Sequence, residues 1–425
     1  MNLLIVTPVP PDPRGFGGIP LAVHAQIAGL IGRHDITLVT VAGPEKNELD
    51  SLDSLSHTGI DIRAARRSMP RIIKRWQQGW RFARTWTIGK YPWRTTWLWD
   101  AGIQKHLDRI FAEKSIDLIS VNDNAMGIYR YPEHIPKILT EHKVRHREST
   151  GLHESKTINR FQKIFYELNW RRWREYQERV WSKFDRVQVF TERDAKIACE
   201  VAPAIKEKLR VIPFGIDPPP ATNPMGEQPG TLLFLGNYTH RANEDAAIWL
   251  VNEVMPKLRA MLPGVRLFLV GAHPAKAIRR LACEDITVTG AVPDVHPYLE
   301  KAAVLLAPVL SGGGMGMKVL MAMAVGKPVI TTARGAEGFM RNGKRPPVII
   351  RESSEEVAEA CAFLLASPKV RKDLGNRARE TVLKYHNAET YGSALEALYA
   401  ESTGRISHES TANLARLFHA NLDFK

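Results

Sequence analysis

The chain has 425 residues, 44% of them hydrophobic and 24% charged, an ordinary composition for a soluble protein with room for two separate cores. Its net charge is +14, and no apolar stretch reaches the ~20 residues of a membrane-spanning helix. The three cysteines are too far apart, and odd in number, for a disulfide framework or a metal knuckle, which favours a reducing compartment.

The N-terminus predicts a buried strand followed by a glycine-rich loop. The apolar run Leu3–Thr7 is too short for a signal peptide and has no basic leader, so we expect a cytoplasmic protein. Gly17 and Gly18 lie between this strand and the first helix. Glycines there either let the backbone approach a ligand closely or form a tight turn without a ligand.

Two series of short apolar runs alternate with helical patterns and predict two parallel sheets covered by helices. The first series is Leu3–Thr7, Ile36–Val41, Asp117–Val121, Lys137–Glu141, Arg186–Phe190 and Leu209–Pro213. A proline-rich joint follows at Pro218–Gly230. The second series is Thr231–Leu235, Val265–Val270, Asp285–Thr289, Ala303–Pro308, Pro328–Thr332 and Pro347–Ile350. In such α/β folds ligands bind outside the carboxyl ends of the strands, so we expect a cleft between two domains.

A basic, tryptophan-rich window runs from Arg63 to about Asp100. Ten Lys or Arg residues and no acid fall between Arg63 and Arg94, and six of the ten tryptophans lie in or just after this stretch. The pattern favours an amphipathic helix on an anionic membrane surface, with the rings at headgroup level. A helical excursion packed on its own domain, with a solvated basic rim, is the alternative.

The stretch Ser311–Gly338, SGGGMGMKVLMAMAVGKPVITTARGAEG, is the most informative part of the sequence. A glycine-rich turn leads directly into a short apolar helix. Free backbone N–H groups at such a helix N-terminus favour a phosphate, and Lys318, one turn inside, adds a positive charge. The pattern predicts a diphosphate-binding site.

This stretch resembles the donor-binding segment of the retaining, nucleotide-sugar-dependent glycosyltransferases of family 4, in the variant that reads roughly GGGxRxKxLEAMAxGKPVVxTxxGAEG. VIPFGIDPPP, from Val211, resembles the signature that ends the first domain of these enzymes, and FDRVQVFTERDA, from Phe184, resembles the strand and helix just upstream. The resemblance covers nearly the whole chain and is weakest in the basic window. It implies the α/β GT-B fold, in which two Rossmann-like domains have parallel sheets that face a central cleft.

The resemblance also implies how the chain is divided. Residues 1–213 would form the acceptor-side domain, and residues 214–385 the domain that binds the nucleotide-sugar donor. Residues 386–425 would form C-terminal helices that return to the first domain: a helix at Glu389–Glu401 and a final amphipathic helix at Ser410–Lys425.

In this family the leaving diphosphate is thought to take the acceptor proton, so the protein must supply positive charge and N–H donors around the β-phosphate. No metal or other cofactor is implied. Lys318 is the first candidate, together with the turn and helix start at Gly313, Gly314, Gly316 and Met317. Arg241, in GNYTHRANED, is the second, although a surface residue paired with Glu244 or Asp245 is an equal alternative.

Three further segments match the family's ligand contacts. Gly17 and Gly18 match a Gly-Gly that lies against the donor's phosphate and sugar. His142, in TEHK, matches a histidine that contacts the transferred sugar or the acceptor, although a strand-end histidine bonded to a loop carbonyl is equally consistent. Gly290 to Val292, in TGAVPD, resembles the turn that contacts the nucleobase through backbone groups.

Met321 departs from the pattern, because the family has a glutamate there that would accept hydrogen bonds from the ribose hydroxyls. Lys318 and Met321 are three residues apart and share one face of the helix. Methionine offers no such acceptor, so nucleotide affinity is expected to be lower. Glu337, in GAEG, is a candidate substitute acceptor.

These features favour a retaining, hexosyltransferase-type enzyme that transfers a sugar from a nucleotide-diphosphate sugar to a lipid-linked or polysaccharide acceptor in cell-surface glycan synthesis. Such an enzyme would work in the cytoplasm, at the inner face of the cell membrane. Met321 leaves open a weakly active or inactive transferase-like protein that binds or regulates a partner. A nucleic-acid partner is not expected, since charge alone suggests it and no recognition module is legible. No motif favours a GT-B epimerase or phosphorylase.

Overall fold

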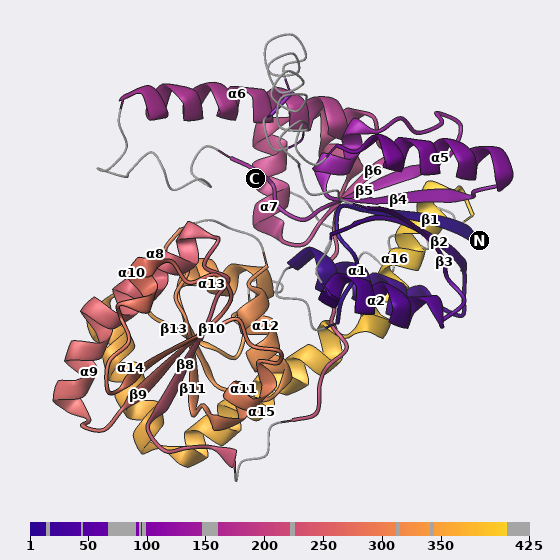
Figure 1. Ribbon diagram of the computed structural model, residues 1–425. Coiled ribbons are helices and arrows are strands. Elements are labelled where there is room, and N and C mark those ends of the chain that lie inside the picture. Colours follow the sequence, from indigo (N-terminus) through magenta and orange to yellow (C-terminus); the bar gives the residue numbers. More distant parts are fainter. Residues whose placement is uncertain are drawn as a thin grey trace. The chain divides into compact units, whose positions relative to one another are not determined.

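The computed structural model describes residues 1–13, 18–43, 46–66, 91–92, 95, 99–146, 160–221, 226–311, 315–340 and 344–405. The chain forms two compact units. Unit 1 contains Met1–Phe214 and a second segment that starts at Ala388, and unit 2 contains Gly215–Asn387. Each unit is built on one parallel sheet with helices packed against it (Figure 1). Of the helices in the described ranges, none has the length and apolar character needed to cross a bilayer.

The sheet of unit 1 has seven parallel strands in the order β3-β2-β1-β4-β5-β6-β7. Strand β1 pairs with both β2 and β4, so the order reverses between β1 and β4. The strands are β1 (Asn2–Thr7), β2 (Asp35–Ala42), β3 (Asp61–Arg66), β4 (Leu118–Asn122), β5 (Lys137–Glu141), β6 (Arg186–Val189) and β7 (Leu209–Val211). Six of these strands lie within two residues of the predicted ones, and the predicted parallel α/β sheet is confirmed.

The edge strand β3 is missing from the predicted set. Its sequence, DIRAAR, has no apolar run, because at the sheet edge most of its side chains stay half-exposed. Arg63 Nε donates to Asp61 Oδ1 at 2.9 Å, and Lys114 Nζ to Asp61 Oδ2 at 2.7 Å. The first two basic residues of the window, Arg63 and Arg66, therefore lie in β3. Residues 67–90, where the amphipathic helix was predicted, lie outside the described residues.

Helices cover both faces of this sheet. They are α1 (Gly18–Leu30), α2 (Lys46–Ser56), α5 (Ala101–Glu113), α6 (Arg160–Ser182), α7 (Glu192–Val201) and α16 (Ala388–Ser402), with 3-10 turns η1 (Asn124–Ile128) and η3 (Pro203–Lys208). Side-chain caps fix two of the helix starts: Asp100 accepts from the Gly102 N–H before α5, and Thr191 from the Asp194 N–H at α7. The helices bury an apolar core against the sheet that includes Val39, Leu107 and Trp181.

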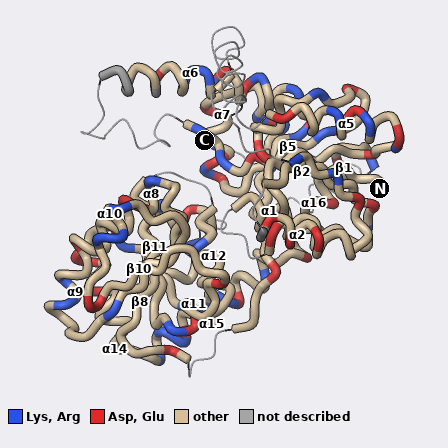
Figure 2. Tube along the Cα trace, viewed as in Figure 1, with Lys and Arg blue, Asp and Glu red and all other residues tan. Residues whose placement is uncertain are grey.

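Charge is unevenly distributed over these helices (Figure 2). Helix α2 carries Glu48, Asp50 and Asp53, whereas α6 carries five arginines and one lysine against three glutamates. In the described part of the chain, α6 therefore contributes to the positive excess, which is not confined to the basic window.

Helix α16 follows unit 2 in the sequence but packs on α1 of unit 1. The two helices cross at Gly29 and Gly392. A Cβ added to Gly392 would overlap the Gly29 carbonyl and stand 2.7 Å from the Gly29 Cα. Glycine at both positions lets the backbones touch, and this contact buries Tyr391, Leu395 and Tyr399 of α16.

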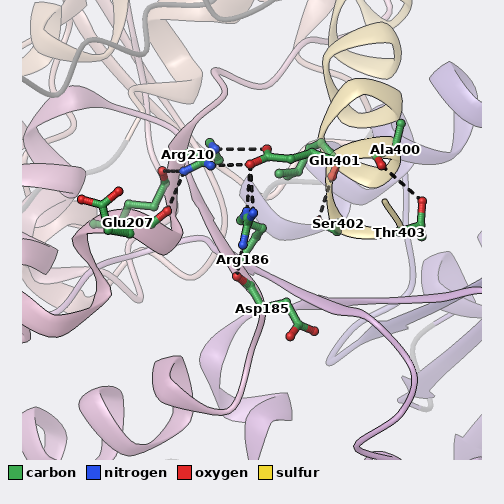
Figure 3. Close-up of polar contacts among 10 residues, drawn as sticks. Asp185, Arg186, Glu207, Arg210, Ala400, Glu401, Ser402 and Thr403 are labelled. Carbon is green, nitrogen blue, oxygen red and sulfur yellow. Dashed lines mark hydrogen bonds and ion pairs between the residues drawn. The ribbon is translucent and has the colours of Figure 1, made fainter. Parts of the chain in front are cut away.

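A buried carboxylate fixes the far end of α16 (Figure 3). Glu401, with 5% of its side chain exposed, accepts from Arg186 Nε at 3.0 Å and from Arg210 Nε at 3.2 Å. Although burial opposes ionisation, the two guanidinium groups hold the pKa of Glu401 below its usual value. The ion pairs join α16 to β6 and β7.

The sheet of unit 2 has six parallel strands in the order β10-β9-β8-β11-β12-β13, and this order reverses between β8 and β11. The strands are β8 (Thr231–Leu235), β9 (Arg266–Val270), β10 (Ile286–Gly290), β11 (Val304–Ala307), β12 (Val329–Thr331) and β13 (Ile349–Ile350). The helices are α8 (Arg241–Trp249), η5 (Leu250–Val254), α9 (Met255–Met261), α10 (Lys276–Arg279), α11 (His296–Lys301), α12 (Met317–Ala324), α13 (Ala333–Ala336), η6 (Glu337–Phe339), α14 (Ser354–Ala366) and α15 (Pro368–Tyr385). Ligands of doubly wound sheets bind at the strand-order reversal, beside the carboxyl ends of the strands.

Candidate functional site

Lys318 lies in the first turn of α12, the helix that follows β11. The residue is half-buried, and its Nζ donates to Asn243 Oδ1 at 2.8 Å and lies 4.1 Å from the centre of the Phe234 ring. Both partners are uncharged, and burial lowers the pKa of Lys318 to about 7. Because neither partner carries a negative charge, the protonated form of Lys318 can pair with an anion.

Asn243 reaches this lysine from α8, the helix that follows β8. Because β8 and β11 are the strands between which the order reverses, the contact spans the expected ligand position of this sheet. Asn243 Nδ2 donates to the Asn237 carbonyl at 2.8 Å, which turns Oδ1 toward Lys318. The sequence does not single out Asn243 or Phe234. Asn243 is one polar residue among several in GNYTHRANED, and Phe234 reads as an ordinary core residue.

Arg241, the second predicted phosphate ligand, begins α8 and pairs with the acid one turn later. Its Nε lies 3.7 Å from Asp245 Oδ2, and both side chains are about half exposed. This is the surface alternative given above, and the contact with Lys318 comes from Asn243. The phosphate-binding role of Arg241 stays a prediction.

The start of α12 is packed against the segment that carries Glu337. A Cβ on Gly316, the N-cap, would stand 3.4 Å from the Gly335 carbonyl oxygen, and one on Gly338 would stand 3.1 Å from the Met315 Cα. Glu337, half-buried at the first position of η6, is thus in a segment that touches the helix start. Gly313 and Gly314 lie outside the described residues.

Helix α12 buries one side and leaves the other partly open. Met317, Lys318 and Met321 are half-buried, whereas Val319 and Leu320 are fully buried. Lys318 and Met321 therefore share the partly open face, as their spacing predicts.

The turn predicted to contact the nucleobase also lies at the carboxyl end of a strand in this sheet. Gly290 ends β10 with a φ of 75°, a left-handed conformation that favours glycine. Its carbonyl accepts from the Gly271 N–H at 3.2 Å, so the turn is fixed to the end of β9. Val292, half-buried, follows in the turn.

In unit 1, His142 follows β5 at the carboxyl edge of the sheet. Its Nε2 lies 3.1 Å from Asn122 Oδ1, at the end of the neighbouring β4, and its ring stands edge-on to Phe190 with centres 5.2 Å apart. The polar partner is a side-chain amide and not the loop carbonyl of the alternative interpretation. Burial lowers the pKa of His142 to about 4, so the ring is neutral at physiological pH. Gly18 begins α1, and Gly17 lies outside the described residues.

The side chain next to His142 is a buried carboxyl group. Glu141 Oε2 accepts from Trp181 Nε1 at 2.9 Å, and the side chain has no arginine or lysine ion-pair partner among the described residues. Burial, reinforced by the charge of Asp123, raises the pKa of Glu141 from 4.5 to about 8. Glu141 is therefore largely protonated at neutral pH.

The substitution Glu141→Gln is expected to remove a pH dependence of stability. Because the folded-state pKa is raised, the folded protein binds more protons than the unfolded chain between pH 4.5 and 8, and wild-type stability falls as pH rises through that window. The glutamine carbonyl can still accept from Trp181. Thermal unfolding at pH 5 and pH 8.5 should show a smaller loss of Tm for the variant. The exposed Glu133→Gln is the matched control, and parallel curves for Glu141→Gln and wild type would contradict the assignment.

The comparison with family models agrees with this geometry. The model described as Glycosyltransferase Family 4 matches residues 16–219, and the model described as Glycosyl transferases group 1 matches residues 229–367, so that the two cover most of both units. The chain belongs to glycosyltransferase family 4.

Curated relatives of this glycosyltransferase-family chain match over part of their length. Trehalose synthase from Pyrococcus horikoshii is 31% identical over 152 residues, which are 32% of this chain and 36% of that protein. Phosphatidyl-myo-inositol mannosyltransferase from Mycolicibacterium smegmatis is 28% identical over 163 residues, 36% of this chain and 41% of that protein. The matched segments thus span about two fifths of these relatives.

Solved structures match the family fold over nearly the whole chain. Sucrose-phosphate synthase from Thermosynechococcus elongatus has a TM-score of 0.68 at 19% identity and covers 95% of this chain and 100% of its own. HepE from Anabaena, in complex with UDP and glucose, has a TM-score of 0.63 at 13% identity and covers 94% and 100%. With two parallel sheets in two units, the chain has the GT-B fold.

Proposed function

We propose that this chain is a retaining glycosyltransferase that uses a nucleotide-diphosphate sugar as donor. The observation that carries the proposal is the Lys318 ammonium, which lies in the first turn of α12 between two uncharged partners at the strand-order reversal of unit 2. A cation beside the N–H groups at a helix start is suited to a diphosphate. HepE, of the same fold, has been crystallised with UDP and glucose.

In this proposal Lys318 and the helix start stabilise the leaving group. As the glycosidic bond breaks, negative charge grows on the β-phosphate, and donors fixed in advance around that point lower the barrier. The amide groups of Gly316 and Met317 are the backbone donors, and the diphosphate takes the acceptor proton on the same face. His142, neutral and half-buried, hydrogen-bonds a sugar hydroxyl at the edge of unit 1.

We further propose a lipid-linked or polysaccharide acceptor at the cytoplasmic face of a membrane. One relative is named as a mannosyltransferase of phosphatidyl-myo-inositol. Helix α6 exposes Ile164, Phe165 and Leu168, and Arg171 and Arg174 are exposed further along it. Apolar side chains beside arginines suit an anionic lipid surface.

The test is a donor panel with the full-length protein. Radiolabelled uridine, guanosine and adenosine diphosphate sugars are incubated with a bacterial lipid extract in detergent or with a soluble polysaccharide. We expect label from one donor to enter the lipid or polysaccharide product, and NMR of that product to show the anomeric configuration of the donor. No transfer from any donor would contradict the activity, and an inverted product would contradict retention.

A transferase-like binding protein is the second candidate, because Met321 occupies the open face of α12 where the family has a glutamate. Nucleotide binding without transfer, unchanged in Met321→Glu, would favour it. Transfer by the wild-type chain that rises in Met321→Glu would favour the enzyme.

A further inference from the structure

A layer of buried polar side chains lies between the sheet of unit 1 and the helices α1 and α16. One branch joins Tyr399 of α16 to Gln26 of α1, and Gln26 to Asn122 of β4. Gln26 Nε2 donates to the Tyr399 hydroxyl at 2.7 Å and to Ser120 Oγ at 2.8 Å, and Asn122 Nδ2 donates to Gln26 Oε1 at 2.9 Å. Asn122 Oδ1 then lies 3.1 Å from His142 Nε2.

The direction of these hydrogen bonds determines which nitrogen of His142 carries the proton. Asn122 uses its NH₂ group toward Gln26, so the atom it turns toward His142 is an oxygen, which can only accept. With the Asn122 amide in this orientation, His142 Nε2 is the N–H donor. A neutral imidazole has a single N–H, which leaves Nδ1 with a lone pair. Within the described part of the chain, the polar contact of this ring is the one at Nε2.

We propose that Asn122, Gln26 and Tyr399 are positioning residues that hold His142 in the Nε2–H tautomer, so that Nδ1 accepts a hydrogen bond from a ligand hydroxyl. This inference rests on the proposed function for the identity of that ligand. The proposal specifies the chemistry of the ligand. A lone pair on a neutral nitrogen selects a hydroxyl donor such as a sugar OH and disfavours a phosphate or carboxylate oxygen. The proposal also gives helix α16 a role at the His142 site, which lies 257 residues before Tyr399 in the sequence.

Burial makes this branch costly unless it is fully bonded. Gln26 and Asn122 are 1% exposed and Tyr399 is fully buried, where an unpaired polar group would destabilise the fold. Apolar side chains of similar size could fill the same space without this constraint. The hydrogen bonds meet that requirement and at the same time fix the orientation of the Asn122 amide.

A second branch in the same layer provides an internal control. Thr140 Oγ1 donates to Gln188 Oε1 at 2.9 Å, and Gln188 Nε2 donates to the Tyr391 hydroxyl of α16 at 3.2 Å. This branch also joins the sheet to α16, with comparable burial, but does not bond to His142. Removing the hydrogen bonds of this second branch removes a similar contribution to stability and should leave the tautomer of His142 unchanged.

The first test is the nitrogen NMR spectrum of the unliganded, full-length protein with ¹⁵N-labelled histidine at pH 7. The His142 signals are assigned by their loss in His142→Gln. We expect a protonated Nε2 and an unprotonated Nδ1, which resonate in separate ranges. A protonated Nδ1, or averaged signals from two exchanging tautomers, would overturn the proposal. This measurement needs no catalytic turnover, so a protein with the expected tautomer but no transfer contradicts the proposed function and leaves the positioning role intact.

The second test compares Asn122→Leu with Thr140→Val. In Asn122→Leu we expect the Nδ1–H tautomer to appear and kcat/KM for sugar transfer to fall at least about tenfold, the loss of one hydrogen bond. In Thr140→Val both the tautomer and kcat/KM should stay within about twofold of wild type, a change of ~0.4 kcal/mol or less in barrier. An unchanged Nε2–H tautomer in Asn122→Leu would overturn the positioning role, as would a tautomer shift of equal size in Thr140→Val.

Discussion

Replacing Lys318 with alanine is expected to lower kcat/KM for sugar transfer by about 10²–10³-fold, the cost of removing one preorganised donor from a charge-developing site. The variant should fold normally. In the wild type, the Lys318 side chain is half-buried and contacts only Asn243 and the Phe234 ring among the described residues. Truncation to alanine therefore breaks no salt bridge there. Circular dichroism and thermal unfolding establish the fold, and initial rates with the active donor establish the activity.

The matched control is Lys372→Ala, which removes a lysine side chain and its positive charge from an exposed position on α15. It should leave kcat/KM within about twofold of wild type, a change of ~0.4 kcal/mol or less in barrier. Equal activities of Lys318→Ala and wild type would remove Lys318 from the mechanism. Equal losses in both lysine variants would instead point to a general effect of net charge.

The same lysine predicts how donor binding depends on pH. Because burial lowers the pKa of Lys318 to about 7, the ammonium form is lost as pH rises through 7 in the unliganded protein. A bound diphosphate favours the ammonium, so above pH 7 binding must be accompanied by proton uptake, and donor affinity should fall from pH 6.5 to pH 9. Lys318→Arg keeps its charge over this range and should lose that dependence.

Replacing Gly392 with valine is expected to destabilise unit 1 by about 3 kcal/mol. A Cβ at this position overlaps the Gly29 carbonyl, which belongs to the backbone of α1 and cannot rotate away. The two helices would have to separate, and the separation would expose Leu395 and weaken the hydrogen bond between Gln26 and Tyr399. Urea unfolding, followed by tryptophan fluorescence, measures the change.

Ser393→Val is the matched control for this prediction, because it puts the same side chain one position further along α16, on the exposed side. It should change stability by less than about 1 kcal/mol. If both variants unfold at the urea concentration of the wild type, the helix crossing contributes little to the stability of unit 1.

Local patterns in the sequence were enough to predict most of the fold. In the described part of the chain, the strands other than β3 are apolar runs with clear limits. The edge strand β3, with half-exposed side chains such as Arg63, has no such run, and the sequence does not predict it. The sequence also placed Lys318 and Met321 on one helix face, since that depends only on a spacing of three residues.

The partners of the site residues could not be predicted, because they are set by tertiary contacts. The hydrogen bond between Asn243 and Lys318 joins residues 75 positions apart in the sequence, and the one between Gln26 and Tyr399 joins residues 373 positions apart. Nothing near these residues in the sequence marks them as different from a surface asparagine or a core tyrosine. They emerge only when α8 and α12, or α1 and α16, are packed on their sheets.

The central claim, a diphosphate held by Lys318 and the first turn of α12, is tested most directly by a crystal structure with the nucleoside diphosphate of the active donor. We predict a β-phosphate oxygen at hydrogen-bond distance, ~3 Å, from Lys318 Nζ and from a backbone nitrogen at Gly316 or Met317. A diphosphate bound elsewhere, with Lys318 still bonded to Asn243 and no phosphate beside it, would contradict the account.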